Sequence, residues 1–137
     1  DNGSKQGMVI SGGSGIIPGS IIVNNPTWTN SKTNALAVVA VDYRGFSTTI
    51  NNPKVINANT SAKGAAIAVY NYNSAVQLGN VTINYPAITD NRTVKMTTAA
   101  FYVGTTVSSK PLQNVSIVKP ILNGVKIGNT TTAKISY

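Results

Sequence analysis

The sequence of 137 residues has no cysteine, no histidine and no glutamate, and its only acidic residues are Asp1, Asp42 and Asp90. Without cysteine and histidine, the chain cannot form a disulfide framework, a thiol nucleophile, a Ser-His-Asp triad or an ordinary zinc or haem site. A hydrolase that works with two carboxylates also has almost no residues to draw on. We therefore expect no catalytic residue, no metal site and no cofactor within this chain.

Long apolar runs and strong helix formers are also scarce. No apolar stretch approaches the roughly 18–20 residues that cross a bilayer, and no signal peptide is visible. Charged residues make up only 10% of the chain, with a net charge of +8, and polarity comes instead from 17 Asn, 16 Thr and 12 Ser. This composition favours one domain rich in β-strands, without insertion into a membrane.

A short motif that ends in proline occurs four times, at Pro26, Pro53, Pro86 and Pro120, with spacings of 27, 33 and 34 residues. In every copy an aliphatic residue lies three positions before the proline. Each proline opens a short second segment, and a polar loop then leads to a third, apolar segment. Three strand-like runs in a unit of about 30 residues predict one coil of a parallel β-helix. The predicted third segments are residues 36–43, 65–72, 98–103 and 133–137.

Other repeat folds fit this pattern less well. The leucine lattice of leucine-rich repeats is absent, and a propeller blade needs four strands. A β-sandwich also alternates strands and turns, but it gives no reason for the same proline motif to recur. The predicted fold is all-β, a right-handed, single-stranded parallel β-helix of about four coils in residues 20–137. Residues 1–19 are predicted to hold an incomplete preceding coil and a glycine-rich loop.

Asparagines recur at fixed distances from the prolines. Coils of a β-helix stack at about 4.7–4.8 Å, so amide side chains at equivalent positions can hydrogen-bond in a ladder. We expect these residues to be structural, and the prolines to occupy corners that need no backbone donor. Asn24, Asn51 and Asn84 lie two positions before a proline, and Asn30, Asn57 and Asp90 lie four positions after one.

The coil length, the expected asparagine ladder and the Ile-Asn-x-Pro corners resemble those of the pectate-lyase-like right-handed β-helix family, and within it the bodies of bacteriophage tailspikes. The resemblance covers residues 20–137 and includes no active-site motif of the family. It implies a homotrimer on a virion tail or on the outside of a cell, which binds, and in many members cleaves, bacterial surface polysaccharide. A shared architecture is weaker support for function than for fold.

Both ends of the chain have the pattern of partial coils. Met8-Val9-Ile10 is predicted to be the third strand of a preceding coil, and Tyr137 falls inside or at the end of such a strand. Because the chain begins with Asp1 rather than Met, we interpret it as a processed product or a fragment. Open solenoid ends expose apolar core and strand edges, so we expect the rest of a longer protein or symmetry-related subunits to cover them.

Three of the four coils carry a cation six positions after the proline. These cations are Lys32, Arg92 and Lys126, with Asn59 in the second coil and Lys95 in one of the same loops. If the coils stack in register, the three side chains form a basic ridge that attracts an acidic polysaccharide. The alternative is that these cations keep the turns soluble and prevent pairing at strand edges.

A second column is aromatic and lies 17 positions after the proline, where Tyr43, Tyr70 and Tyr137 occur, with Tyr102 close by. Facing outward, these rings form a platform on which sugar C–H faces stack, whereas facing inward they fill the core or a contact between subunits. Trp28 lies two positions after the first proline and has no aromatic equivalent in later coils. It is either a loop anchor or a local platform for a sugar.

The sequence favours a structural and receptor-binding segment of a phage tailspike, or of a similar surface fibre, that engages bacterial cell-surface polysaccharide. One alternative is a fragment of a polysaccharide depolymerase, a lyase or glycoside hydrolase, whose catalytic residues lie elsewhere or across subunits. Tyr43 and Arg44 beside Asp42 are the cluster of groups that a lyase could use. Another alternative is a bacterial surface adhesin. Nucleic acid is not an expected partner, because the cations are scattered and no binding motif is present.

Overall fold

The computed structural model describes residues 6–11, 15–40, 43–71, 79–105, 114–130 and 132–137, and every regular element in these ranges is a β-strand. The strands form three parallel sheets, which we name A, B and C. Sheet A contains β1 (Met8–Ser11), β4 (Leu36–Ala40), β7 (Gly64–Asn71), β10 (Thr97–Thr105) and β13 (Lys126–Asn129). Sheet B contains β2 (Gly15–Asn24), β5 (Tyr43–Asn51), β8 (Val81–Asn84), β11 (Val115–Val118) and β14 (Ala133–Ser136). Sheet C contains β3 (Thr27–Thr29), β6 (Lys54–Ile56), β9 (Ala87–Thr89) and β12 (Ile121–Asn123).

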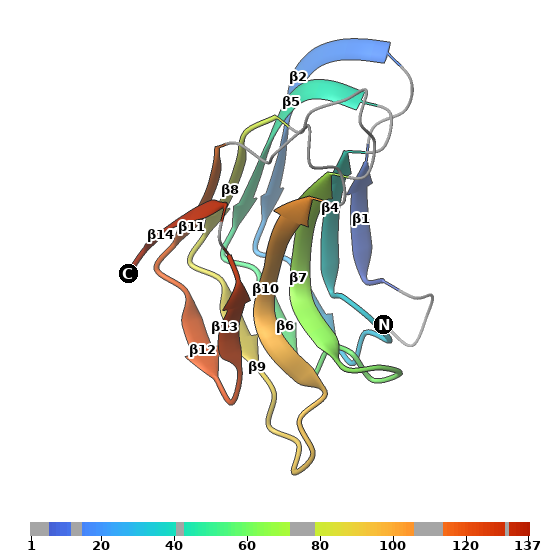
Figure 1. The fold of residues 1–137 in the computed structure, drawn as a ribbon, viewed down its shortest axis with the longest axis vertical. Helices are drawn as coiled ribbons and strands as arrows, with labels where there is room; N and C mark the ends of the chain where they lie inside the picture. Colours follow the sequence, from blue (N-terminus) through green and yellow to red (C-terminus); the bar gives the residue numbers. More distant parts are fainter. Residues whose placement is uncertain (1–5, 12–14, 41–42, 72–78, 106–113, 131) are drawn as a thin grey trace.

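The chain visits the sheets in the constant order B, C, A, and each strand pairs in parallel with the strands one coil away. Four complete passages, from β2 to β13, are flanked by β1 and β14. Figure 1 shows the resulting stack, in which strands far apart in the sequence lie side by side. The prediction of an all-β parallel β-helix is therefore confirmed. Residues 8–10, which the sequence assigned to a preceding coil, lie in β1, and β1 pairs with β4 in sheet A.

The repeated proline corners join sheet B to sheet C. Proline offers no N–H, but its carbonyl continues the bonding between coils: the Lys54 N–H donates to the Pro26 carbonyl at 2.8 Å, and the next two corners repeat this bond. The residue before each proline has a left-handed conformation, which Asn tolerates better than most residues. These residues are Asn25, Asn52, Tyr85 and Lys119, with φ angles of 53°, 51°, 52° and 48°.

The core consists of inward side chains that stack in register from coil to coil. In sheet B, for example, Ile50 pairs with Ile83 and Ile83 with Ile117, and all three are fully buried. Fully burying a side chain of this size stabilises a fold by about 1.5–3 kcal/mol. The stacked columns therefore fix the register of the coils. In sheet C the corresponding column is Trp28, Val55, Ile88 and Leu122.

The last coil differs from the prediction. Residues 133–137 were expected to form its third segment, but β13 takes that place beside β10, and β14 pairs with β11 in sheet B. The reason is a short turn, because only Gly124 and Val125 separate β12 from β13. Gly124 has a φ of 73°, and a side chain on it would collide with the Asp90 backbone carbonyl. The expected third segment at residues 36–43 is also too long, since Tyr43 already begins β5 of sheet B.

Candidate functional site

The asparagines form ladders, as predicted, at the end of the sheet B strands. The Asn51 Nδ2 group donates to Asn24 Oδ1 at 2.8 Å, and the Asn84 Nδ2 group donates to Asn51 Oδ1 at 2.8 Å. A second ladder was not predicted: Asn52 Nδ2 donates to Asn25 Oδ1 at 2.9 Å. These amides satisfy one another between coils, so they hold the stack together.

The asparagines four positions after the prolines bond differently. Their backbone N–H groups continue the stacking, with Asn30 donating to the Ile56 carbonyl at 3.0 Å and Asn57 to the Thr89 carbonyl at 2.9 Å. The Asn57 side-chain oxygen accepts the backbone N–H of Asn91 at 3.0 Å. These residues therefore have structural partners as expected, but through the backbone and a loop.

In sheet A, the side chains of β7 and β10 do not alternate strictly between the inner and the outer face. Ala66 and Ile67 are both fully buried, and Ala100 and Phe101 repeat this pair on the next strand. The pairing of the two strands also shifts between Thr97 and Ala99. An irregularity of this kind disrupts the ladder locally. The alanines that line the outer face of sheet A are Ala65, Ala68 and Ala99, beside larger side chains on the same strands.

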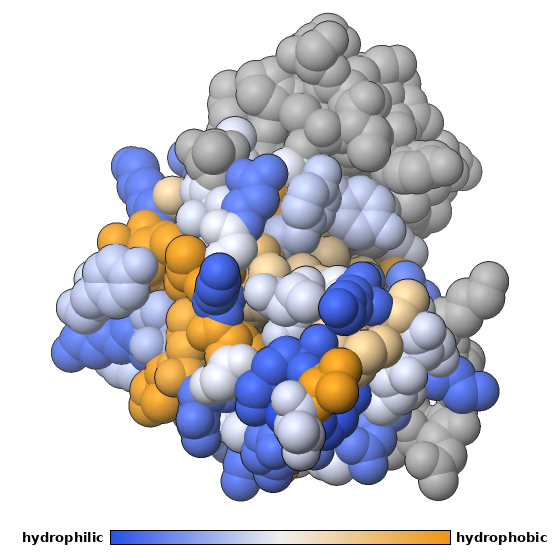
Figure 2. Space-filling model, turned by 60° about the horizontal axis from the view of Figure 1, so that its bottom comes forward, coloured by the Kyte–Doolittle hydropathy of each residue, from blue (hydrophilic) through white to orange (hydrophobic). Residues whose placement is uncertain are grey.

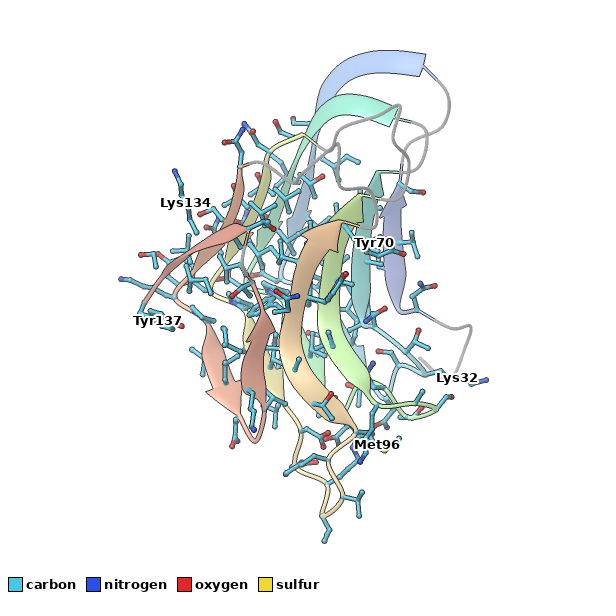
Figure 3. The ribbon with its side chains drawn as sticks, in the orientation of Figure 1. Lys32, Tyr70, Met96, Lys134 and Tyr137 are labelled. Carbon is cyan, nitrogen blue, oxygen red and sulfur yellow. The ribbon has the colours of Figure 1, made fainter. Side chains whose placement is uncertain are left out.

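An open hollow of about 440 Å³ lies over these alanines. Its tyrosine side chains are Tyr70, which is half-buried, and Tyr102, which is 37% exposed. Tyr102 extends along its own strand, since a side chain on Gly104 would meet the Tyr102 hydroxyl at 2.9 Å. Figure 3 shows Tyr70 near the C-terminal ends of β7 and β10. The remaining lining residues are Asn34, Gly64, Ala65, Ala68, Thr98, Ala99, Phe101 and Asn129.

A second open hollow, of about 450 Å³, lies beside the first, and Thr98 lines both. Its charged groups are Lys95 and Lys126, and Thr97, Gly124 and Val125 complete the lining. The Lys95 ammonium donates to the Asp90 backbone carbonyl at 2.6 Å. We name the two hollows together the sheet A groove. It combines aromatic, amide, hydroxyl and cationic side chains on one face.

Asp90 organises the loop that carries Lys95. Its side chain is fully buried, and its carboxylate accepts backbone N–H groups from Arg92, Met96 and Thr97. The Arg92 guanidinium pairs with Asp90 Oδ2 at 2.6 Å. Hydrogen bonding from Arg92 is the largest cause that holds the pKa of the Asp90 carboxyl well below its usual range, and the backbone donors act in the same direction against burial. The loop is therefore folded around a charged pair.

The basic ridge expected from Lys32, Arg92 and Lys126 is not formed as a column. Arg92 pairs with Asp90 and also donates to the Ala58 carbonyl at 2.6 Å. Lys126 belongs to β13 and lies beside Ala99, because the short last turn shifts its register. Lys32 lies in the loop after β3, and Figure 3 shows it pointing away from the body of the protein. Of the three cations, only Lys126 lines the sheet A groove.

The expected tyrosine column is also divided between sheets. Tyr70 lies in sheet A, whereas Tyr43 begins β5 of sheet B and pairs with Gly15 there, and Tyr137 follows β14. The aromatic neighbour of Tyr70 in the groove is instead Tyr102. The sequence holds one sign of this arrangement. Ala66-Ile67 and Ala100-Phe101 are pairs of adjacent apolar residues, and all four are buried, whereas a regular strand alternates inward and outward side chains.

Trp28 is a core residue. It is 7% exposed, lies at the inward position of β3 and heads the column that continues with Val55. Gly7 packs directly against its indole. In this position Trp28 offers no outer surface for a sugar, and its role is that of an anchor.

Among the residues that the structure describes, no group of three acidic, histidine or cysteine side chains could hold a metal ion. The described ranges likewise contain no helix that is long and apolar enough to cross a membrane. Asp42 of the proposed lyase cluster lies outside these ranges, as do the side chains of Tyr43 and Arg44. In comparisons with protein families, curated proteins and solved structures, none matches this chain.

Proposed function

We propose that the chain is a receptor-binding segment of a phage tailspike, or of a similar surface fibre, and binds bacterial cell-surface polysaccharide in the sheet A groove. The observation that carries this proposal is the pair Tyr70 and Tyr102 above a floor of alanines. Aromatic rings present flat apolar faces with a polar tip, which suits sugar C–H faces and their hydroxyls. At the rim, the Asn34 amide donates to the Ala65 carbonyl at 2.6 Å and the Thr98 hydroxyl donates to the Gly64 carbonyl at 3.4 Å, which leaves the oxygen atoms of both side chains as acceptors for sugar hydroxyls.

An extended ligand suits this site better than a small, enclosed one. Both hollows are open to solvent, and Thr98 lines both of them. The groove crosses β7, β10 and β13, which belong to three successive coils of one sheet. Paired strands form a rigid support, so that binding orders few protein side chains. A polymer that lies across the strands meets both hollows at once.

The proposal includes a right-handed helix sense and a homotrimer on a virion tail or outside a cell. Support for a partner comes from large apolar side chains on the surface at the two ends of the stack, since Ile121 on β12 is 65% exposed and Ile22 on β2 is 61% exposed. Figure 2 shows apolar surface gathered on the side of β12 and β13. Patches of this kind mark interaction sites. Light scattering on the purified chain tests this part, and a stable monomer would contradict it without affecting the groove.

The test of the function is a binding screen on an array of bacterial surface polysaccharides, both neutral and acidic. We expect the wild-type chain to bind at least one of them and the Tyr70→Ala/Tyr102→Ala variant to bind at least about tenfold more weakly, because each lost stacking contact is worth about 1 kcal/mol. Tyr137→Ala is the matched control, since this tyrosine is 81% exposed and lies outside the groove. Equal binding by all three proteins, or no binding by the wild type, would reject the proposed function.

A further inference from the structure

We infer that the hollow between Lys95 and Lys126 is an anion subsite, and that the polysaccharide carries a carboxylate, sulfate or phosphate group beside the sugar that stacks on the tyrosines. This inference rests on the proposed function, because it assigns a second part of the same groove. Lys95 and Lys126 come from different coils, one from the loop before β10 and one from β13. They line one hollow of about 450 Å³ together with the hydroxyl-bearing Thr97 and Thr98.

The position of Lys95 is set by the protein. Its ammonium group donates to the Asp90 backbone carbonyl at 2.6 Å, which uses one of the three donors of a lysine. Gly124 leaves room for it, because a side chain at that position would meet the Lys95 nitrogen at 3.1 Å. A cation held in this way loses less conformational entropy on binding than a freely moving surface lysine.

No free side-chain carboxylate in the described part of the chain neutralises the positive charges of the two lysines in this hollow. Asp90 is the only acidic residue in the described part of the chain, and its carboxylate is already paired with Arg92 and with backbone N–H groups. Both lysines therefore add to a positive field in the hollow. A bound anion supplies the missing negative charge, and hydrogen bonds between charged partners are roughly twice as strong as neutral ones.

The register of β13 sets the distance between the two parts of the groove. Lys126 lies beside Ala99, and Asn129, which lines the first hollow, lies beside Tyr102. Asn129 lies three positions after Lys126 along the strand, which corresponds to about 10 Å. A disaccharide spans such a distance. We therefore expect the acidic substituent on the stacked sugar or on its immediate neighbour.

The experiment uses the same array, together with oligogalacturonate, its carboxyl-reduced form and dextran sulfate. Lys95→Gln/Lys126→Gln is compared with the matched control Lys54→Gln/Lys134→Gln, which removes two exposed lysines outside the groove. We expect the polysaccharides that bind to be acidic, and the groove variant to bind them about tenfold more weakly while the control keeps its affinity. Raising the salt concentration should weaken the wild type and the control but affect the groove variant much less.

The possible results separate this inference from the proposed function. If the array identifies only neutral polysaccharides, or if the groove variant binds acidic ones as tightly as the wild type, the anion subsite is rejected and the tyrosine platform stands. The anion subsite is likewise rejected if the tyrosine variant loses binding and the lysine variant binds every polysaccharide as tightly as the wild type. Loss of acidic binding only with dextran sulfate assigns the subsite to sulfate, and loss with oligogalacturonate but not its reduced form assigns it to carboxylate. Thermal unfolding of each variant shows that the fold is retained.

Discussion

The outer faces of sheets A and B are built by the same coils but carry different side chains. On sheet B the alternation is regular, so Thr49, Thr82 and Ser116 lie in one row along the stack, next to the asparagine ladder. On sheet A the buried pairs Ala66-Ile67 and Ala100-Phe101 interrupt the alternation, and the outer face is hollowed. Where the alternation is regular, asparagine side chains at equivalent positions bond to one another between coils. Where the alternation along the strands is interrupted, tyrosine side chains lie around a concave surface, which is where a ligand can bind.

The largest effect on stability is expected at Asp90, which supports the rim of the sheet A groove. Asp90→Ala removes the partner of Arg92 and of three backbone N–H groups, and breaking a buried pair in this way costs about 3 kcal/mol or more. Urea denaturation measures this loss. Binding of polysaccharide should fall with it, because Lys95 loses its position. A change below about 1 kcal/mol would contradict the view that the loop is folded around this carboxylate.

Acid should lower the stability of the protein by protonating the same carboxylate. The loss should be smaller than that caused by Asp90→Ala, because the carboxyl group remains in place. The pKa of Asp90 is lowered in the folded state, so its stabilising contribution is complete above the unfolded pKa of about 4 and is lost as the pH falls from there through the lowered folded pKa. The free energy of unfolding should therefore decline between about pH 5 and the acid limit of the measurement. Asp90→Asn serves as the control, and its stability should change less over the same range.

Changes on the regular face of sheet B should lower the stability of the protein without lowering its affinity for polysaccharide, the opposite of changes in the groove. Asn51→Ala removes the bond to Asn24 and the bond from Asn84, and two such bonds contribute about 1–2 kcal/mol. Asn24→Ala removes one of the two and should cost about half as much. Neither change should alter the affinity for polysaccharide. A loss of affinity with either variant would show that sheet B takes part in binding.

The smallest effect on stability is expected for the groove itself. Tyr102→Ala removes a side chain that is 37% exposed on the outer face, and surface changes of this kind stay within about 0.5 kcal/mol. Its affinity for polysaccharide should nevertheless fall. Together with Asn51→Ala, this variant tests the comparison directly. One change should affect stability alone and the other binding alone.

Part of the fold could be predicted because its signal is local and repeated. Each proline corner needs a left-handed residue and a proline in sequence, and the asparagine ladder repeats at the same distance from the proline. The groove could not be predicted in this way. Counting from the proline placed Lys126 in a turn, whereas the two-residue connection before β13 places it in a strand beside Ala99. The same count assigned Tyr43 to the column of Tyr70, but Tyr43 belongs to the next sheet.

The sequence by itself determined that the chain is an all-β solenoid with proline corners, because stacking of equivalent residues imposes a period that a single chain displays. It also determined that a conventional zinc, haem or thiol site has no ligands here, since no cysteine or histidine occurs. Only the tertiary structure decided which side chains share a surface. Loop lengths and a bulge shift the register between coils, so residues at equal distances from their prolines can lie on different sheets. The approach of Tyr70 to Tyr102 and of Lys95 to Lys126 follows from that register.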